Sequence, residues 1–520
     1  MKLPKESYDF AKKHIENYFD SDFFPKPFEF DILFSNWAEV LDYLTKTDIS
    51  NFNIESPITY AVPKHSKGYR IVHQLDPINS IVYTALAHFI SEEIEKGRIS
   101  ASDKSACSYR TSLGSSGNFF ENGSGYEDYY EKSMDLSKKY KYILQADITD
   151  FYNQIYLHRL QNSIEYCSPK ILKEVSHEIE NFLMDINNNV SKGIPVGPAA
   201  SIIMAEALLI DIDQFLLDKG YEYCRYVDDF RIFGDSKPEL ELLVHDMTIY
   251  LYDNHRLTLE GSKTKVLECA TFINDYLLDP EKIERNEVNK EIEKLNLKVI
   301  NQYFEFDTEE DDEEKKQINN DEKIKAQGEA FKTLMKQILE KDYFDLGLSR
   351  HILRRSKKLR SRAIVPQLLD NLDIFAPVMR DVILYLDAVT TDKMIELNID
   401  RFINIIENTN VVKIPYCRYW LEYYFASFEE FSKHGKVKDF IFKGNNIKNC
   451  ALYARNTKSM NWVRQYKNKL FNLGSWERRA VIYSSIILSQ DERIHWMQNI
   501  ENNTNNYLEL LIARHVKSIT

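Results

Sequence analysis

Glycine and proline are unusually scarce in this chain. The sequence has 16 glycines and 14 prolines among 520 residues, about 3% each, against averages of about 7% and 5%. Because turns between strands depend on these two residues, a large β-sandwich or β-barrel is excluded. The hydrophobic content of 43% is near the globular norm and rules out disorder along the whole length. The sequence therefore predicts a folded and mostly helical protein.

Hydrophobic periodicity divides the chain in two. Up to about residue 280, short apolar or β-branched segments at 69–72, 142–147, 223–227 and 230–233 alternate with helical stretches, a pattern typical of strands between helices. This part is predicted to be an α+β domain over 1–280. Beyond about residue 327 nearly all of the sequence reads as amphipathic helices. We predict an all-α, helical-repeat-like domain over 327–520, similar to an α-solenoid.

The segment between these domains is predicted to be a linker over 281–326. It contains the acidic run EFDTEEDDEE at 305–314, followed by polar sequence rich in Asn and Lys. A dense run of like charges is typical of a solvated loop.

Charge and cysteine usage indicate the class of protein. The net charge is −13, and the six cysteines lie far apart with no CxxC pair, which excludes a zinc ribbon and fits reduced thiols in the cytoplasm. No stretch approaches the roughly 20 apolar residues needed to cross a bilayer, and the N-terminus is too charged for a signal peptide. We expect a cytoplasmic protein with no membrane partner. The acidic total disfavours wholesale coating of nucleic acid but allows a locally basic channel.

Two adjacent acids form the most informative string, YVDDF at 226–230. Apolar and aromatic residues on both sides predict a β-hairpin with Asp228 and Asp229 at its tip. Burying two like charges side by side is unfavourable unless a cation neutralises them. The alternative is an ordinary Asp-Asp turn between strands.

A third acid, Asp147, directly follows the apolar segment 142–146. A strand end can bring its carboxylate to the rim of a sheet, beside the hairpin acids. Three converging carboxylates could hold a pair of Mg²⁺ ions about 3.5–4 Å apart, with Mn²⁺ as a substitute. The alternative for Asp147 is a helix N-cap, a role for which Asp150 competes.

Two further segments have the composition of ligand-binding loops. The first, at 191–201, holds two glycines and two prolines within six residues, so its backbone can lie close to a ligand. The second, at 63–70, supplies three cations around a turn. Such a hairpin suits the triphosphate of a nucleotide, with Arg70 able to contact it in a bidentate manner. Either segment alone could be a surface loop.

In this order, the segments resemble the motif set of reverse transcriptases over residues of about 55–275. The motifs that carry the resemblance are Lys64 to Arg70, Tyr109-Arg110, Asp147 to Tyr152, GIPVGP at 193–198, YVDD at 226–229 and Lys263-Thr264. The sequence GIPVGPAASIIMAE and the helical C-terminal half resemble those of the AbiK-like abortive-infection reverse transcriptases of bacteria. The resemblance implies fingers and palm followed by the helical domain.

The same resemblance implies a function and partners. Members of that group are anti-phage defence enzymes that polymerise DNA from dNTPs, some without a template and from a protein hydroxyl. It implies a homo-oligomer with a single-stranded DNA product, which can be covalently attached to the protein. A reverse transcriptase that copies a dedicated non-coding RNA is an alternative, and an inactive binding protein with a polymerase fold is another.

The resemblance also assigns roles to single residues. Asp147 and Asp228 correspond to the principal metal ligands and Asp229 to the third acid, with Ile148 beside them in the metal site. Lys263 corresponds to the lysine proposed as the acid for pyrophosphate, and its alternative is a solvated surface lysine. Tyr152 falls where these enzymes screen against a ribose 2′-OH. The residues assigned to nucleotide binding are Lys64, Arg70, Arg110, Ile148, Phe151, Tyr152, Pro195 and Gly197.

One position departs from the pattern of templated relatives. Many of them have Gln where Val196 stands, and valine cannot hydrogen-bond near a nascent base pair. This departure favours template-independent synthesis.

The helical half contains a basic segment without an acid at 350–362. It is a candidate surface for single-stranded product or RNA, and a solvated helix face shielded by the acidic run is the alternative. Its cations are Arg350, Arg354, Arg355, Lys357, Lys358, Arg360 and Arg362.

Priming from the protein needs a hydroxyl that reaches the acids, and a phenol is more acidic than an alcohol. Tyr8 is the first candidate, because a chain terminus can be mobile enough to enter a cleft, and Tyr18 is the second. The alternative for Tyr8 is packing, since Tyr8, Ala11 and Ile15 have helical spacing.

Overall fold

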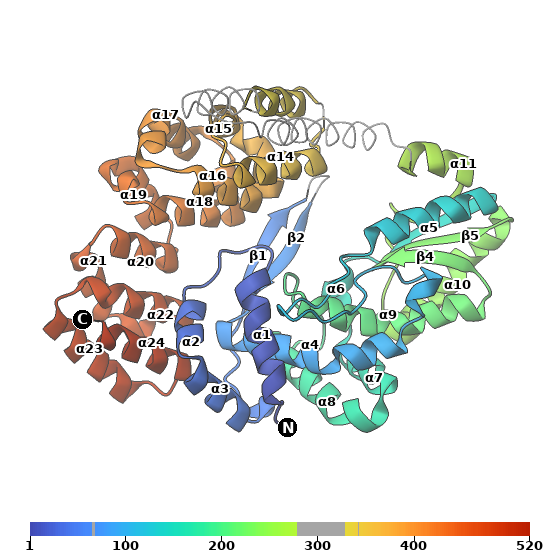
Figure 1. Cartoon of the computed structure of the whole chain (residues 1–520), viewed down its shortest axis with the longest axis horizontal. Coiled ribbons are helices and arrows are strands. Elements are labelled where there is room, and N and C mark those ends of the chain that lie inside the picture. Colours follow the sequence, from blue (N-terminus) through green and yellow to red (C-terminus); the bar gives the residue numbers. More distant parts are fainter. Residues whose placement is uncertain (65–67, 278–327, 342, 520) are drawn as a thin grey trace, which may run out of the picture. The chain divides into compact units, whose positions relative to one another are not determined.

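The computed structural model describes residues 1–64, 68–277, 328–341 and 343–519. They belong to two compact units (Figure 1). The first unit comprises Met1–Thr59 and Val72–Lys282, and the second, called the helical unit below, comprises Tyr60–Ile71 and Ile283–Thr520. The predicted linker 281–326 and both of its boundaries lie outside the described residues.

Helices dominate the first unit, and several begin where the sequence supplies a cap. Asp76 accepts a hydrogen bond from the Ile78 N–H at the start of α4, and Ser236 does so for Glu239 at the start of α10. Each of these helices has a proline in its first two positions, where no N–H is needed. The helices are α1 (Lys5–Tyr18), α2 (Glu29–Ser35), α3 (Trp37–Lys46), α4 (Pro77–Gly97), α5 (Tyr126–Lys139), α6 (Phe151–Gln154), α7 (Leu157–Cys167), α8 (Pro169–Ile186), α9 (Ala200–Asp218), α10 (Lys237–His255) and α11 (Cys269–Phe272).

An antiparallel sheet of order β4-β5-β3-β6 forms the centre of the first unit. Its strands are β3 (Tyr142–Asp147), β4 (Glu222–Tyr226), β5 (Asp229–Gly234) and β6 (Lys265–Glu268). The strands predicted near 142–147, 223–227 and 230–233 are thus present, whereas β6 was not predicted. A separate two-stranded sheet pairs β1 (Ile58–Pro63) with β2 (Tyr69–Gln74).

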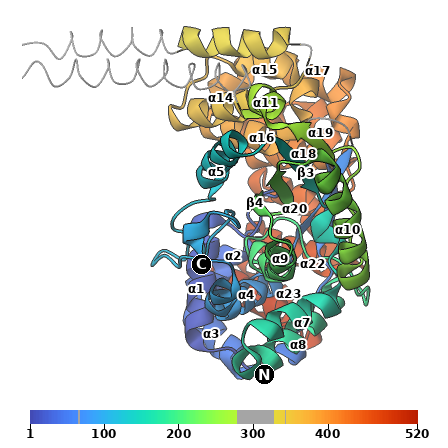
Figure 2. The same ribbon diagram turned by 90° about the vertical axis from the view of Figure 1, so that its right-hand side faces the viewer.

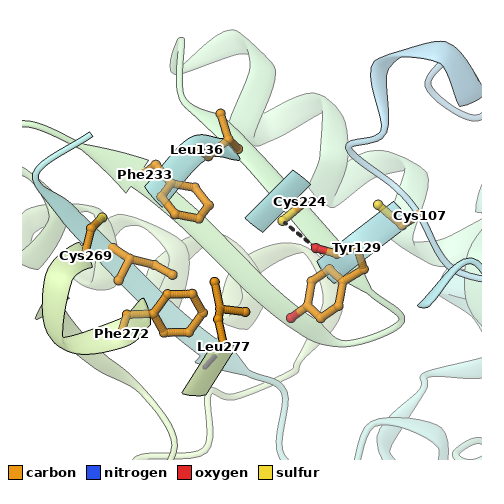
Figure 3. Packing of buried hydrophobic residues seen from close by; sticks show 9 residues of the cluster. Cys107, Tyr129, Leu136, Cys224, Phe233, Cys269, Phe272 and Leu277 are labelled. Atoms are coloured by element: carbon orange, nitrogen blue, oxygen red, sulfur yellow. Dashed lines mark hydrogen bonds between the residues drawn. The ribbon is translucent and has the colours of Figure 1, made fainter. Parts of the chain in front are cut away.

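Helices cover the sheet on both sides, with α5 along one side and α10 along the other (Figures 1 and 2). The α5 side is held by a buried cluster of aromatic, aliphatic and cysteine side chains (Figure 3). Ile143 and Phe233 belong to this cluster, and alternation along the strands sends Leu144 and Ile232, also buried, to the opposite face. The other members are Cys107, Tyr129, Leu136, Cys224, Cys269, Phe272 and Leu277.

The second unit is helical apart from its β1–β2 residues, within the residues described. Its main helices are α14 (Leu346–Lys358), α15 (Val365–Asp370), α16 (Met379–Val389), α17 (Asp392–Asn408), α18 (Pro415–Ser427), α19 (Gly435–Phe442), α20 (Ile447–Asn456), α21 (Met460–Lys467), α22 (Ser475–Ser484), α23 (Gln490–Asn503) and α24 (Tyr507–Ser518). The even-numbered helices pack in sequence from α14 to α24, and α15, α17 and α19 pack likewise. This two-layer stacking is that of an α-solenoid, which confirms the predicted fold class.

Tyr60 of strand β1 packs on this solenoid. The ring of Tyr60 lies 5.3 Å from that of Tyr419 and 6.4 Å from that of Tyr416. Both of these partners are buried on α18. An aromatic contact of this kind explains why residues 60–71 group with the helical unit, although the sequence places them among the first unit's motifs.

In the part of the chain that the structure describes, no helix combines the length and the apolar character needed to cross a membrane.

Each unit has its own core, and a matched pair of phenylalanines can test this. Phe272 and Phe431 are both fully buried, in the first and the helical unit respectively. Replacing either by Ala should lower the free energy of unfolding of its own unit by about 3–5 kcal/mol, through lost burial and the cavity left behind. Thiol labelling under native conditions reports each core separately, because burial raises the pKa of Cys269 to about 11 and of Cys450 to about 12.

Phe272→Ala should speed labelling of Cys269 and Cys224, and Phe431→Ala should speed labelling of Cys417 and Cys450. Each variant is the control for the other. Equal acceleration at all four thiols in both variants would contradict separate cores.

Candidate active site

The register of the central sheet brings two of the predicted acids face to face. Asp147 at the end of β3 pairs with Asp229 at the start of β5. Tyr226 also pairs with Asp229, across the β4–β5 hairpin, so Val227 and Asp228 form its turn. Three carboxylates are therefore carried at one end of the sheet.

This end of the sheet disfavours negative charge. Burial, together with the neighbouring Asp147 carboxylate, raises the pKa of Asp228 to about 7. Burial also raises the pKa of Asp229, although the Arg231 guanidinium opposes that rise. A cation bound near Asp147, Asp228 and Asp229 would relieve the repulsion between their carboxylates.

Lys263 supplies one such cation. Its Nζ lies 2.8 Å from Asp147 Oδ2, and although burial lowers its pKa, the hydrogen bond to Asp147 raises the pKa above its ordinary value. Backbone bonds bring it there: the Thr149 N–H donates to the Thr258 carbonyl at 2.9 Å, and the Glu260 N–H donates to the Asp147 carbonyl at 2.8 Å. The lysine predicted from the motif is in contact with the strand-end acid.

The oxygen donors of these acids suit a hard divalent cation, although the acids alone do not form a complete set of ligands. Among the residues described, no group of three or more His, Cys, Asp or Glu side chains is gathered closely enough to hold a metal ion. Mg²⁺ commonly binds through one or two carboxylates and takes its remaining ligands from waters and substrate phosphates. Asp147 and Asp228 match that usage, because both are carboxylates and the two repel each other.

Asp150, which competes with Asp147 for the role of a helix N-cap, stands at the N-cap position of α6, although its side chain makes no capping hydrogen bond. Asp150 is the residue before α6, with φ of 47°. Its Oδ1 accepts a hydrogen bond from Asn153 Nδ2 at 2.8 Å. Asp147 is left to face Lys263 and Asp229.

The aromatic pair after Asp147 lies close to the acids. Tyr152 is partly buried, and burial followed by the nearby Asp228 carboxylate raises its pKa well above the ordinary value. Phe151 is buried and packs edge-on against the Tyr152 ring at 5.8 Å. Ile148 is buried as well and bridges to Leu259. The structure therefore brings these predicted nucleotide-binding positions to the acids.

The predicted loop at 193–198 holds the backbone around Tyr152. The Gly193 N–H donates to the Ile155 carbonyl at 2.8 Å, and the Ile194 N–H donates to the Tyr152 carbonyl at 2.9 Å. The Pro195 carbonyl accepts from the Ser201 hydroxyl at the start of α9. Backbone hydrogen bonds thus join this loop to the segment that carries Tyr152.

The same loop is locked to β2 by His73. The His73 N–H donates to the Val196 carbonyl at 2.9 Å, and the Val196 N–H donates to His73 Nδ1 at 3.1 Å. Burial lowers the pKa of His73 to about 4, so near neutral pH its Nδ1 is free to accept. Gly197 follows with φ of 135°.

The two cations predicted to bind the triphosphate, Lys64 and Arg70, belong to the helical unit. Lys64 and Arg70 are exposed on the β1–β2 hairpin, and the Lys64 N–H donates to the Gly68 carbonyl at 3.0 Å. Residues 65–67 of this turn lie outside the described residues. Because Lys64 and Arg70 belong to the second unit, their binding of a triphosphate stays a prediction.

Arg110, expected to bind nucleotide, is engaged elsewhere. Its guanidinium forms an ion pair with Glu95 and donates to the Ile99 carbonyl at 2.8 Å. These bonds join the end of α4 to the segment that follows it. These contacts give Arg110 a structural role, and its binding of nucleotide stays a prediction.

The N-terminus is not the mobile tail that priming from Tyr8 requires. Tyr8 is 0% exposed in α1, which packs on α4, and burial raises the pKa of its phenol well above the ordinary range. The Met1 amine lies 3.2 Å from Glu178 Oε1. The alternative, that Tyr8 packs, describes this structure.

Tyr18 is better placed. It is 41% exposed at the end of α1, and its hydroxyl lies 2.9 Å from the Ser116 hydroxyl. Ser116 belongs to the loop in which Tyr109 lies 5.6 Å, ring to ring, from Tyr226. Tyr18 thus contacts a loop that reaches the hairpin carrying Asp228.

The predicted basic segment lies on α14 and the turn after it. Arg350 and Arg354 contact Asp381 at 3.3 Å and 3.0 Å, and Arg362 Nε donates to the Val389 carbonyl at 2.8 Å. The residues lining a cavity of about 440 Å³ beside the helix are Gly347, Arg350, His351, Arg354, Arg355 and Lys358.

Sequence reasoning missed a buried charged group around the hairpin. Arg225, Glu206 and Asp213 are 0–1% exposed and bonded to one another. The signal was present: an arginine stands inside an apolar strand, and two acids stand seven residues apart in the apolar helix 199–217.

Comparison with known proteins agrees with this geometry. Residues 62–311 match the family described as reverse transcriptase (RNA-dependent DNA polymerase), and this match indicates a nucleotidyltransferase. No curated protein matches the chain.

Among solved structures, the chain is similar to telomerase from Candida albicans in complex with a TWJ fragment of telomeric RNA. That match has 13% identity and a TM-score of 0.32 and covers 78% of this chain and 68% of the other. Apo telomerase from Candida tropicalis matches with 12% identity, a TM-score of 0.32 and coverages of 82% and 71%. At these values the likeness says nothing about function.

Gly197 offers a test of how tightly the loop is held. A Cβ at this position would lie 2.5 Å from Ser21 Oγ and 3.1 Å from the His73 carbonyl oxygen. Gly220, with φ of 78°, has nothing within 4 Å of such a Cβ. Gly220→Ala should therefore lower the free energy of unfolding only by the strain of a left-handed alanine, about 1–2 kcal/mol. Gly197→Ala should lower it clearly more, because its Cβ would also clash.

Urea unfolding followed by labelling of the first unit's thiols measures both variants. A Gly197→Ala variant as stable as Gly220→Ala would show that the segment at residue 21 and the loop are not in close contact.

Proposed function

We propose that the reverse transcriptase domain at residues 62–311 adds deoxynucleotides to a hydroxyl by two-metal catalysis. The observation that carries this proposal is the strand register that sets Asp147 opposite Asp229, with Asp228 in the adjoining turn and Lys263 on Asp147. All three acids of the motif are present in this arrangement. Their presence disfavours the inactive binding protein.

Asp147, Asp228 and Asp229, with the Ile148 backbone, would hold Mg²⁺ or Mn²⁺. When bound, the metal pair supplies activation of the attacking oxygen and stabilisation of the leaving pyrophosphate. Lys263 is protonated beside Asp147 and is the group available to give a proton to the pyrophosphate.

The nucleotide would lie against the aromatic pair. Tyr152 lies near Asp228, and its ring would exclude a ribose 2′-OH by contact. Phe151 buttresses that ring, and the backbone at Pro195 and Gly197 lines the base side. Lys64 and Arg70, exposed on their hairpin, would bind the triphosphate.

The sequence resemblance supports a narrower function: anti-phage defence by template-independent, protein-primed DNA synthesis. Val196 is tied through its backbone to His73, and its side chain has no group that could hydrogen-bond a template base. The same resemblance supports a homo-oligomer and a product attached to the protein. Copying of a non-coding RNA is the second candidate.

We propose that the basic surface of α14 binds the phosphates of single-stranded product or RNA. Asp381 contacts both Arg350 and Arg354, which orients two guanidiniums beside the 440 Å³ cavity. Arg355 and Lys358 line the same cavity, and Lys357, Arg360 and Arg362 continue the segment. Cations in such a row suit a nucleic-acid backbone.

Asp228→Asn tests the metal site. It removes one charge from the acids at unchanged volume, so nucleotide addition with Mg²⁺ should fall by about 10³-fold or more, about 4 kcal/mol in barrier height. In metal-free buffer at pH 8 the variant should melt no lower than the wild type, because it relieves repulsion from Asp147. Incorporation of each labelled dNTP and a melting curve give both results.

The matched control is Asp235→Asn, the same change at the other, exposed end of β5. It should retain wild-type incorporation. Asp228→Asn with near wild-type activity would refute the metal assignment. Repeating the wild-type assay after RNase treatment separates the two candidate functions, since loss of product would favour the RNA-copying enzyme.

Priming is tested by removing one phenolic oxygen at a time. Tyr18→Phe should abolish DNA covalently bound to the protein, because Tyr18 is partly exposed and bonded to the loop that reaches Tyr226. Tyr8→Phe, at the buried position, should leave the adduct unchanged. Denaturing gels of nuclease-trimmed protein report the adduct. If Tyr18→Phe keeps it, mass spectrometry of the adduct would identify the primer.

A further inference from the structure

A buried charged network lies beneath the catalytic hairpin. Arg225 on β4 is 0% exposed, and its guanidinium contacts Asp213 at 2.6 Å and 2.7 Å and Glu206 at 2.9 Å. Seven residues separate the two acids on α9, so both face the same side of the helix. Arg98 is also buried and contacts Glu206 at 2.9 Å. Two arginines and two carboxylates thus neutralise one another away from water.

Ser108 connects this network to the turn that carries Asp228. Its hydroxyl donates to Glu206 Oε1 at 2.7 Å and accepts the Val227 N–H at 2.8 Å. Arg225 Nη1 donates to the Val227 carbonyl at 3.3 Å. Both backbone polar groups of Val227 are therefore bonded to the network.

Val227 has the conformation that most needs such support. Its φ is 55°, in the left-handed region where a β-branched side chain meets the backbone carbonyl and where such residues are outliers. A residue stays in this region only when its surroundings fix it. Without the bonds from Ser108 and Arg225, Val227 would relax toward an extended conformation.

The conformation of Val227 decides where Asp228 points, because the two residues form the turn between paired Tyr226 and Asp229. We infer that Ser108, Glu206 and Arg225 are positioning residues, which hold Val227 left-handed so that the Asp228 carboxylate meets the metal. This inference rests on the proposed two-metal function.

Stability alone does not account for the network. A buried group of ion pairs is often no more stabilising than apolar residues of the same volume, because each charge must be desolvated. Apolar residues could pack α9 on β4 equally well. They could not bond the N–H and the carbonyl of Val227.

Ser108→Ala removes the link between the network and the turn and leaves the ion pairs in place. Side chains that orient a metal ligand typically affect metal affinity or activity by about 10–100-fold. We expect kcat to fall by about that factor and the Mg²⁺ concentration for half-maximal rate to rise several-fold, with the KM for dNTP within about two-fold.

The matched control is Ser176→Ala. Ser176 is a fully buried serine in α8 that accepts a hydrogen bond from Gln161 at 3.2 Å and donates to the Lys173 carbonyl at 2.8 Å. It should leave kcat and the Mg²⁺ requirement unchanged. A Ser108→Ala variant that behaves like Ser176→Ala in an active enzyme would overturn the inference while leaving the proposed function intact.

A second background separates positioning from general packing. Val227→Gly removes the strain at the turn, since glycine adopts positive φ freely. Ser108→Ala should then reduce kcat by a clearly smaller factor in the Val227→Gly background than in the wild type. Equal factors in the two backgrounds would mean that Ser108 does not act through the strained residue, and would also overturn the inference.

Amide hydrogen exchange gives a readout that does not need activity. Exchange of the peptide containing Val227 should be about tenfold or more faster in Ser108→Ala, and unchanged in Ser176→Ala. If the wild type adds no nucleotide, the proposed function fails, and the exchange rates alone decide whether the network holds the turn. Unchanged exchange in Ser108→Ala would refute that role.

Discussion

Repulsion among three carboxylates at one end of a sheet is the constraint around which the first unit is built. Antiparallel pairing sets Asp147 opposite Asp229, and burial keeps water from screening them. Cations lie near two of the acids: Lys263 contacts Asp147, and the Arg231 guanidinium opposes the rise that burial causes in the pKa of Asp229. No ion pair to Asp228 is found among the described residues, and its pKa rises to about 7. Asp228, the acid in the turn, is thus the one whose charge no ion pair compensates among the described residues.

Hydrogen bonds to buried and half-buried polar side chains hold the surrounding loops. Neutral His73 bonds both polar groups of Val196, Ser201 bonds the Pro195 carbonyl, and Asn187 bonds the carbonyls of Lys192 and Gly193. A buried donor or acceptor left unpaired is strongly unfavourable. Each loop therefore has one arrangement in which all its groups are satisfied, and this arrangement keeps Tyr152 near Asp228.

Features that rest on local pattern were predicted from the sequence, and those that rest on tertiary partners were not. Apolar residues on both sides of the two acids predicted the hairpin with Asp228 and Asp229 at its tip, although Asp229 in fact begins β5. Helical periodicity predicted the solenoid. The four residues of β6 are too few to show a period. The sequence equally could not show that Arg110 contacts Glu95 or that Tyr60 packs on α18, and for Tyr8 it left packing and mobility as alternatives. Catalytic roles stay predictions.

Several departures from local rules meet at the turn that carries Asp228. Single features of this kind also occur elsewhere: Tyr109 has a φ of 45°, and Arg479 is fully buried in α22. At the hairpin, by contrast, a β-branched residue has positive φ, two acids adjoin, and an arginine is fully buried in the strand that leads there. Each feature is unfavourable by itself. Proteins tolerate such conflicts mainly at functional sites, and here all of them meet within the five residues 225–229.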